Sequence, residues 1–134
     1  MRRTCVRTCE VTVLLNHLDL PVSDVPAVAA FLVDHFGFRP ITRVDSPAIV
    51  ILDDGHGFTF VLQRRKDPAE RFPAGLHIGF IVDDPAEVSV HRERLAAAGL
   101  RISEVQTNAR GVQCYCTGPS ELIVEVSCRA RLEA

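Results

Sequence analysis

The stretch LHIGFIVDDP (residues 76–85) combines a strand-like apolar run with a histidine near its start and two aspartates and a proline at its end. A second stretch, NHLDLPVSDVP (residues 16–26), has the same order of histidine, aliphatic run, aspartate and proline. Each stretch leads into an alanine-containing segment whose apolar residues recur at helical spacing. The two stretches therefore mark the first strands of a repeated unit, and this repeat decides the fold.

The first unit is predicted to run from residue 11 to residue 63. A strand over 11–22 leads into a helix whose first amides can donate to Ser23 or Asp24, and Gly37 closes that helix. Three shorter β-like runs follow, separated by turn-rich segments, at residues 39–44, 48–52 and 58–63. The predicted order is strand, helix and three strands, which is a βαβββ unit.

The second unit, at residues 76–128, repeats this order after a charged, proline-containing linker at 64–75. Its predicted elements are a strand at 76–82, a helix at 85–98 and strands near 102–106, 112–117 and 122–128. One unit cannot bury both its sheet face and its helix face alone, so the two should pack together in a single domain of 134 residues. We predict an α+β fold of two βαβββ modules, whose concave sheet faces curve around a common cavity.

The composition is that of a compact folded protein, with 47% hydrophobic and 24% charged residues. The formal net charge of -2 gives no electrostatic reason to expect nucleic acid or an anionic membrane as a partner. The apolar run at 11–15 is far shorter than the roughly 20 residues of a membrane span and lacks the features of a signal peptide. We therefore predict a cytoplasmic protein that binds a small molecule.

The five cysteines form an odd count, which favours free thiols over a disulfide framework. Cys5 and Cys9 lack the spacing of a zinc site. Cys114 and Cys116 share one face of a predicted strand, where they are expected to be small buried residues.

Side chains alternate between the two faces of a strand, and this parity places the candidate ligands. His17 shares its face with Asp19, whereas His77 lies opposite the apolar residues that face the second helix. Glu125 lies in an apolar strand, where an unpaired carboxylate would be costly to bury, so it needs a partner. That partner could be an arginine such as Arg43. Two histidines and a carboxylate are also a common ligand set for a divalent metal ion.

The chain resembles the vicinal oxygen chelate superfamily, which includes glyoxalase I, bleomycin resistance proteins, fosfomycin resistance proteins and extradiol dioxygenases. The resemblance rests on residues 16–38, 76–100 and 122–128. It implies an open, cup-shaped sheet that can hold a metal ion, commonly in a homodimer. It also implies that His17, His77 and Glu125 are metal ligands. If modules exchange between chains, the linker could act as a hinge.

The remaining ligand position of the family falls in FTFVLQRR (residues 58–65), where many metal-dependent members have a glutamate. Val61 aligns with Glu125, and Gln63 has the same parity and a carbonyl oxygen that could coordinate. With Val61 at the position, the set resembles the three-ligand iron site of extradiol dioxygenases. With Gln63, it resembles the four-ligand site of isomerases and lyases.

The metal could be iron, zinc, nickel, manganese or magnesium, and it would bind two neighbouring oxygens of a substrate. The sequence does not single out a catalytic residue, and Asp19 and Glu125 are both candidates for the general base. The predicted function is a metal-dependent enzyme of the lyase, isomerase or dioxygenase type, acting on a small oxygenated metabolite.

The alternative is a metal-free protein that sequesters a natural product or antibiotic, as the resemblance to bleomycin resistance proteins implies. The missing carboxylate in residues 58–65 favours this alternative. The two matched histidines count against it, as do the few large aromatic residues, with one Tyr and no Trp. Candidate ligand-binding residues are Asp19, Val61 and, if its side of the strand is concave, Tyr115.

Overall fold

The computed structural model describes residues 12–131. Its helices and strands confirm the predicted α+β class. In chain order the elements are β1 (His17–Val22), α1 (Val25–Phe36), β2 (Arg39–Pro40), β3 (Ile49–Asp53), β4 (Thr59–Arg64), β5 (Ile78–Ile81), α2 (Pro85–Ala97), β6 (Arg101–Ile102), β7 (Gln106–Asn108), β8 (Gly111–Thr117), the short 3-10 helix η1 (Pro119–Glu121) and β9 (Ile123–Arg129).

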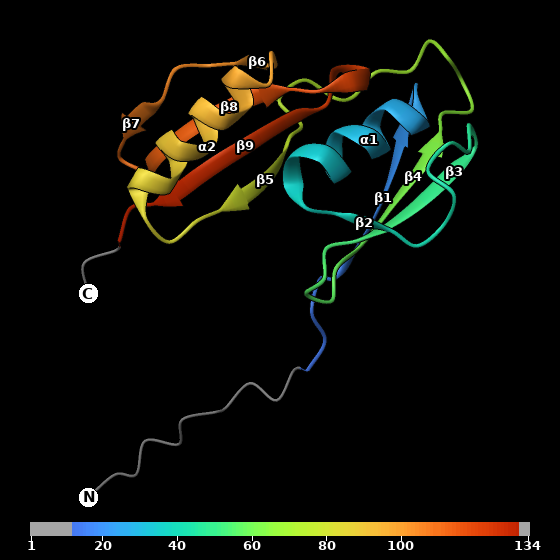
Figure 1. Ribbon diagram of the computed structural model, residues 1–134, viewed down its shortest axis with the longest axis horizontal. Coiled ribbons are helices and arrows are strands. Elements are labelled where there is room, and N and C mark those ends of the chain that lie inside the picture. Colours follow the sequence, from blue (N-terminus) through green and yellow to red (C-terminus); the bar gives the residue numbers. More distant parts are fainter. Residues whose placement is uncertain (1–11, 132–134) are drawn as a thin grey trace, which may run out of the picture.

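The strands form two separate sheets (Figure 1). The first sheet has the order β1-β4-β3-β2, and the second has the order β5-β9-β8-β6, with β7 also paired to β8. In each sheet the first strand pairs in parallel with the last strand and lies at the edge. A helix follows the first strand in both cases, as the repeated sequence pattern predicts.

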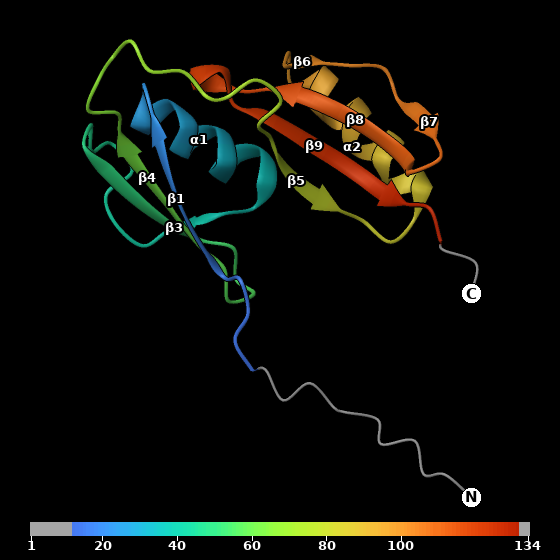
Figure 2. The same cartoon turned by 180° about the vertical axis from the view of Figure 1, so that it is seen from behind.

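Helix α1 begins and ends at the residues that the sequence indicates. The side chain of Asp24 accepts a hydrogen bond from the backbone amide of Ala27 at 3.0 Å, which caps the helix. Gly37 ends the helix in the left-handed region, at φ 72°. The helix covers the first sheet on the side that faces β5 (Figures 1 and 2). At its last turn Phe36 stacks on Phe80 of β5, with ring centroids 4.6 Å apart.

One hydrophobic core cluster contains residues of both units. The units meet through aromatic residues such as Phe38, which lies between α1 and β2, and Phe80 of β5. This differs from the expected packing around a common cavity. The cavity that contains His77 is lined by residues of the second unit alone.

The first strand is shorter than the predicted 11–22. It begins at His17, which is the residue paired with Thr59 at the start of β4. Earlier residues have no strand opposite them, so 12–16 take no regular structure. Val11 lies outside the described residues.

Hydroxyl side chains interrupt two other predicted strands. In the 39–44 run only β2 forms, and Thr42 Oγ1 accepts the backbone amide of Ile51 at 2.9 Å in place of a ladder bond. The 102–106 run splits into β6 and β7, and between them Ser103 Oγ accepts the amide of Tyr115 at 3.0 Å. Both cases show a side chain competing with backbone pairing.

Both first strands present an unpaired backbone edge within residues 12–131. The carbonyls of Asn16 and Val22 accept amides at the two ends of β4, so the even-numbered residues of β1 face β4. The backbone groups of the odd-numbered residues, His17 and Asp19 among them, face the open edge. In the second sheet the backbone amide of Val82 donates to β9, so the backbone groups of His77 likewise face the open edge.

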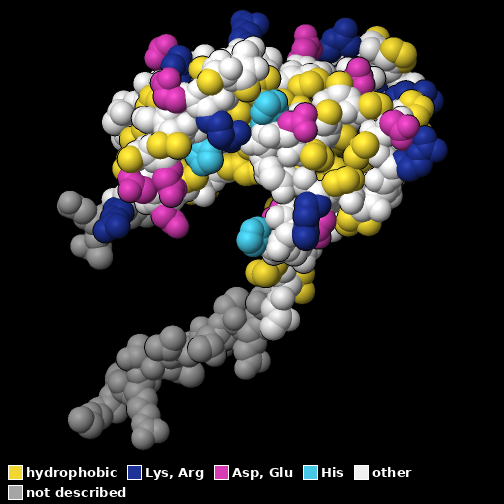
Figure 3. Space-filling view, viewed as in Figure 1, with side chains coloured by type: hydrophobic (Ala, Val, Ile, Leu, Met, Phe, Trp, Pro, Cys, Tyr) yellow, Lys and Arg dark blue, Asp and Glu magenta, His cyan; other side chains and the backbone are white. Residues whose placement is uncertain are grey.

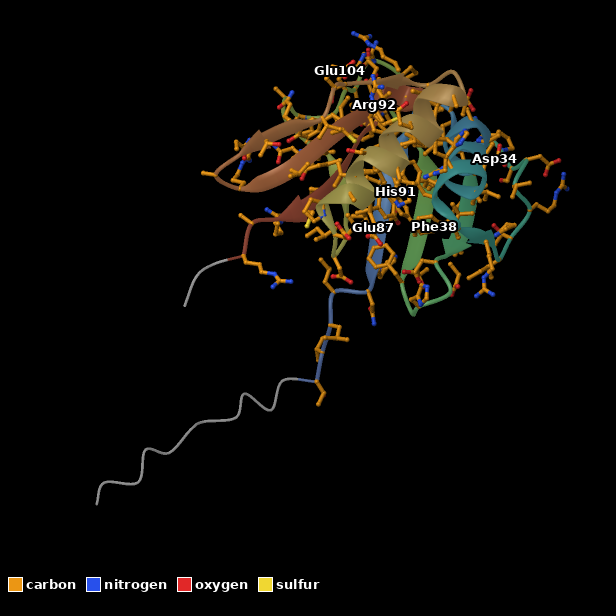
Figure 4. The ribbon with its side chains drawn as sticks, turned by 60° about the vertical axis from the view of Figure 1, so that its left-hand side comes forward. Asp34, Phe38, Glu87, His91, Arg92 and Glu104 are labelled. Atoms are coloured by element: carbon orange, nitrogen blue, oxygen red, sulfur yellow. The ribbon has the colours of Figure 1, made fainter. Side chains whose placement is uncertain are left out.

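Helix α2 packs on the second sheet through its buried residues Val88 and Leu95. On its outer flank Arg92 Nη2 donates to the carboxylate of Glu104 at 2.8 Å (Figure 4). Arg92 Nε also donates to the carbonyl of Ser103 at 3.3 Å. These bonds tie the segment between β6 and β7 to the helix.

Basic, acidic and hydrophobic side chains are interspersed on the face drawn in Figure 3. Within residues 12–131, none of the helices has the length and apolar character that a membrane crossing requires. The cytoplasmic location stays a prediction. Cys114, Cys116 and Cys128 are free and buried, in agreement with the sequence, whereas Cys5 and Cys9 lie outside the described residues.

Candidate metal and ligand site

His77 and Glu125 meet on the face of the second sheet that lies away from helix α2. His77 directly precedes β5, and its Nε2 lies 3.1 Å from Oε2 of Glu125 on β9. The Glu125 side chain is 13% exposed, so the carboxylate is largely removed from water, and His77 is its partner. Arg43 pairs with Asp45 instead, at 2.9 Å. The alternative pairing of Glu125 with Arg43 is therefore wrong.

The backbone sets the tautomer of His77. Its Nδ1 lies 3.0 Å from the carbonyl oxygen of Gly75, and because a carbonyl oxygen only accepts, Nδ1 carries a proton. In the neutral ring, Nε2 then directs a lone pair at the Glu125 carboxylate, so two acceptors face each other. Either a proton on Nε2 or a cation bound to both groups satisfies this pair.

The geometry of the pair suits a shared metal ion. Nitrogen and oxygen ligands lie about 2.1 Å from an ion such as zinc, and at right-angled to tetrahedral geometry two of them are roughly 3.0–3.4 Å apart. The separation of 3.1 Å between His77 Nε2 and Glu125 Oε2 falls in that range. The carbonyl of Gly75 supplies the outer hydrogen bond that ligating histidines usually make.

Tyr115 stands beside the pair, on β8, in register with Glu125. Its ring meets the His77 ring edge-on, with centroids 6.0 Å apart and planes at 89°. Burial and the Glu125 carboxylate raise the pKa of Tyr115, whereas the Arg110 guanidinium acts in the opposite direction. Tyr115 therefore keeps its proton at neutral pH and can donate a hydrogen bond. It lies on the same face of the sheet as Glu125.

The remaining predicted residues gather on the first sheet. Gln63 Nε2 donates to Asp19 Oδ1 at 2.6 Å, so the amide carbonyl of Gln63 is left for another partner. Val61 pairs in register with Asp19 and is 8% exposed. Its side chain has no donor atom for a metal, so of the two residues considered for the fourth position, Val61 and Gln63, only Gln63 can offer an oxygen. His17 lies at the start of β1 in the same sheet.

A single chain does not bring all the predicted ligands together. Among residues 12–131, no three His, Cys, Asp or Glu side chains gather into a group that could hold a metal ion. His77 and Glu125 form a pair on the second sheet, while His17 and Gln63 belong to the first. One chain therefore supplies half of the predicted ligand set at one place.

The cavity at the His77 pair also contains residues that the sequence analysis missed. It has a volume of about 110 Å³ and is lined by His77, Arg110, Gln113, Tyr115, Glu125, Ser127 and Arg129. Strand parity could have found Ser127 and Arg129, because they alternate with Glu125 along β9. Arg110 and Gln113 join the cavity only through the pairing of β8 with β9.

Two βαβββ units, each with a helix packed on its own sheet, define the class of fold. The chain belongs to the Glyoxalase/Bleomycin resistance protein/Dioxygenase superfamily, whose profile matches residues 14–126. This confirms the resemblance to the vicinal oxygen chelate superfamily. No curated protein matches the chain.

Solved structures support the same fold. A possible glyoxalase from Bacillus cereus is 28% identical, with a TM-score of 0.74, and the match covers 86% of this chain and 98% of that one. Lactoylglutathione lyase from Agrobacterium tumefaciens is 21% identical, with a TM-score of 0.68 over 89% and 95% of the two chains. The fosfomycin resistance protein FosX from Listeria monocytogenes is 21% identical, with a TM-score of 0.70 over 90% and 96%.

Proposed function

We propose that the protein is a metal-dependent enzyme that acts on a small oxygenated metabolite. The observation that carries this proposal is the position of His77 Nε2, 3.1 Å from the Glu125 carboxylate, with Nδ1 of the same ring 3.0 Å from the Gly75 carbonyl. A divalent ion held by both groups would satisfy them and remain open to substrate oxygens. Among structural relatives, a FosX variant from Listeria monocytogenes was solved with Mn(II) and 1S,2S-dihydroxypropylphosphonic acid.

In this proposal His17 of the partner subunit supplies the third ligand in a homodimer. His17 and His77 occupy corresponding positions at the starts of β1 and β5, the two strands with open edges. An open edge is a template for pairing, and a two-fold arrangement of β1 against β5 of the other copy closes both edges at once. Apolar side chains next to these edges, Leu15 at 91% and Ile81 at 60% exposed, would be covered by such pairing.

When bound, the metal would polarise two neighbouring oxygens of the substrate. The carbonyl of Gly75 holds the His77 ring in place, and the Tyr115 hydroxyl donates a hydrogen bond to a substrate oxygen. Asp19, held by its hydrogen bond from Gln63, is a positioned carboxylate that can accept a proton from the substrate. The free carbonyl of Gln63 is the candidate for a fourth ligand.

Metal analysis of untagged protein, after incubation with Mn(II), Fe(II), Ni(II) or Zn(II), tests the ligand set. We expect a single metal ion per chain in the wild type and its loss in His77→Ala and in His17→Ala, with the circular dichroism spectrum unchanged. His56→Ala, at an exposed turn, is the matched control and should retain the metal. Stoichiometric metal in His77→Ala would contradict the site. A wild type that binds none of these metals would favour the metal-free sequestering protein.

Co-expression of the two ligand variants tests the shared site. A mixed dimer of His17→Ala and His77→Ala chains keeps one intact set, with His77 from one subunit and His17 from the other. The mixture should therefore bind part of the wild-type metal, although neither variant binds it alone. If the mixture binds no more metal than the separate variants, the third ligand does not come from a second copy.

A further inference from the structure

Two buried polar side chains of the His77 cavity have unused hydrogen-bonding atoms. Gln113 on β8 and Ser127 on β9 face each other in register, and each is only 4% exposed. Gln113 Nε2 and Ser127 Oγ find no hydrogen-bond partner in the part of the chain that the structure describes. A buried polar group without a partner costs free energy, which a ligand in this cavity would recover. Both residues line the cavity.

Two arginines line the same cavity. Arg129 ends β9, and Arg110 lies in the turn before β8, where its carbonyl accepts the amide of Ala130 at 2.9 Å. Within residues 12–131 neither guanidinium forms an ion pair, whereas Arg92 pairs with Glu104 at 2.8 Å. Their shared cavity therefore provides positive charge for an anion.

Hydrogen-bond donors dominate the lining. A guanidinium group only donates, the free atom of Gln113 is an N–H donor, and the hydroxyls of Tyr115 and Ser127 can donate. Glu125 is the one carboxylate among the lining residues. It lies at the far end from Arg129, about 13 Å away along β9 at roughly 3.3 Å per residue. The matching ligand is rich in acceptor oxygens and negatively charged.

The size of the cavity restricts that ligand further. The cavity is small, with a volume of about 110 Å³, which suits a compact oxyanion. Arginine binds carboxylate and phosphate oxygens in pairs, because its planar donors match their geometry. Ser127 lies about 7 Å along the strand from Glu125. A ligand with an anionic group at Ser127 can thus place a second group, only a few bonds away, at the His77 pair.

We infer that Arg110, Gln113, Ser127 and Arg129 bind an oxyanion of the substrate, either a carboxylate or a phosphoryl group. This inference rests on the proposed function, because the His77 pair is the reacting end of the same substrate. The inferred substrate is therefore a small oxygenated acid or phosphoryl compound. Its oxyanion would lie a few bonds from the two oxygens that the metal holds. Tyr115 lies between the two ends and can donate to either.

Titration calorimetry with inorganic phosphate and, separately, with acetate tests the anion site in the full chain. Metal is first removed on a chelating resin, so that phosphate cannot bind through a metal ion, and ionic strength is held constant with sodium chloride. We expect saturable binding of at least one anion. Tighter binding of phosphate identifies a phosphoryl group, and tighter binding of acetate identifies a carboxylate. Absence of saturable binding for both anions overturns the inference.

Substitutions of the lining residues test whether the anion binds in this cavity. Arg110→Gln and Arg129→Gln should each lower the affinity for the more tightly bound anion by roughly ten- to a hundredfold, which is the range for a hydrogen bond to a charged group. Ser127→Ala should weaken it by a smaller factor. Arg101→Gln, an exposed arginine on β6 of the same sheet, is the matched control and should bind like the wild type. Thermal melts show that each variant is folded, and wild-type affinity in both Arg110→Gln and Arg129→Gln overturns the inference.

Metal content measured on the same preparations separates the two proposals. A wild type that takes up metal but binds neither anion overturns the anion site and leaves the proposed function in place. A protein that binds an anion through Arg110 and Arg129 but takes up no metal overturns the proposed function and supports the anion site.

Discussion

Replacing Gly111 with alanine is expected to disrupt the end of the β8–β9 hairpin. Gly111 has a φ of 127°, and a Cβ at this position would lie 2.1 Å from the carbonyl oxygen of Cys128 and 2.7 Å from the amide nitrogen of Ala130. Both neighbours are backbone atoms, which cannot rotate away as a side chain can. The added methyl group therefore forces β9 away from β8 at this end.

The expected loss follows from two costs. A positive φ costs an L-residue about 1–2 kcal/mol. Movement of β9 also breaks the bond from the Ala130 amide to the Arg110 carbonyl, at about 0.5–1.5 kcal/mol. With residual overlap, Gly111→Ala should lower the free energy of unfolding by about 2–4 kcal/mol. At an unfolding entropy of about 2.1 cal/mol/K per residue, this lowers the Tm by roughly 7–14 °C.

Gly99→Ala is the matched control. Gly99 also has a positive φ, of 81°, but nothing lies within 4 Å of the position that its Cβ would take. This variant carries the backbone strain without the overlap, so its Tm should fall by only about 4–7 °C. Differential scanning calorimetry of the two variants compares them directly. Equal losses in Tm would refute the argument, because they would show that the Cβ contact at Gly111 adds nothing to the strain.

Tyr115 is the single tyrosine in a chain without tryptophan, so the ultraviolet absorption of its phenolate reports this titration alone. Burial and the Glu125 carboxylate raise the pKa of Tyr115. The midpoint of its titration should therefore lie above about 10, and it should fall in Glu125→Gln. A wild-type midpoint below about 10 would contradict the burial of Tyr115. Because the folded state holds this proton more tightly, its stabilising contribution is present below about pH 10 and is lost as the pH rises through the folded pKa. Burial raises the pKa of Cys116 to about 11 and also raises the pKa of Cys114. In a variant with serine at the other cysteines, both thiols should therefore react with Ellman's reagent far more slowly in the folded protein than after unfolding. Equal reaction rates in the two states would refute their burial. Asp24→Ala removes the cap of α1 and should cost about 1 kcal/mol in urea unfolding, and an unchanged midpoint would show that the hydrogen bond to Ala27 contributes no stability.

Local signals made the order of elements predictable. At Asp24 and Asp84 a capping side chain and a nearby proline occur within a few residues, and both aspartates cap helices in the structure. Strand parity likewise placed His77 on the side away from the residues that face the second helix, because that inference needs only alternation along one strand. Information of this kind lies within short windows of the sequence.

Long-range features could not be predicted in the same way. The packing of Phe36 on Phe80 joins residues of different units, and nothing in either stretch specifies it. Gln113 reaches the site only through the register of β8 with β9, which is fixed by the whole hairpin. The strand near 39–44 is cut short because the Thr42 hydroxyl satisfies a backbone amide, an event that composition does not reveal.

The proline at position 21 limits what the open edge of β1 can accept. Odd-numbered residues of this strand turn their backbone groups outward, so His17 and Asp19 offer amides at the edge, whereas Pro21 has none. A strand added there can form a ladder of only about four residues, which is too short to propagate from chain to chain as a stacked sheet. The usable half of the edge is the half that carries His17. The same proline thus protects the chain from open-ended aggregation and directs an incoming strand to the candidate ligand.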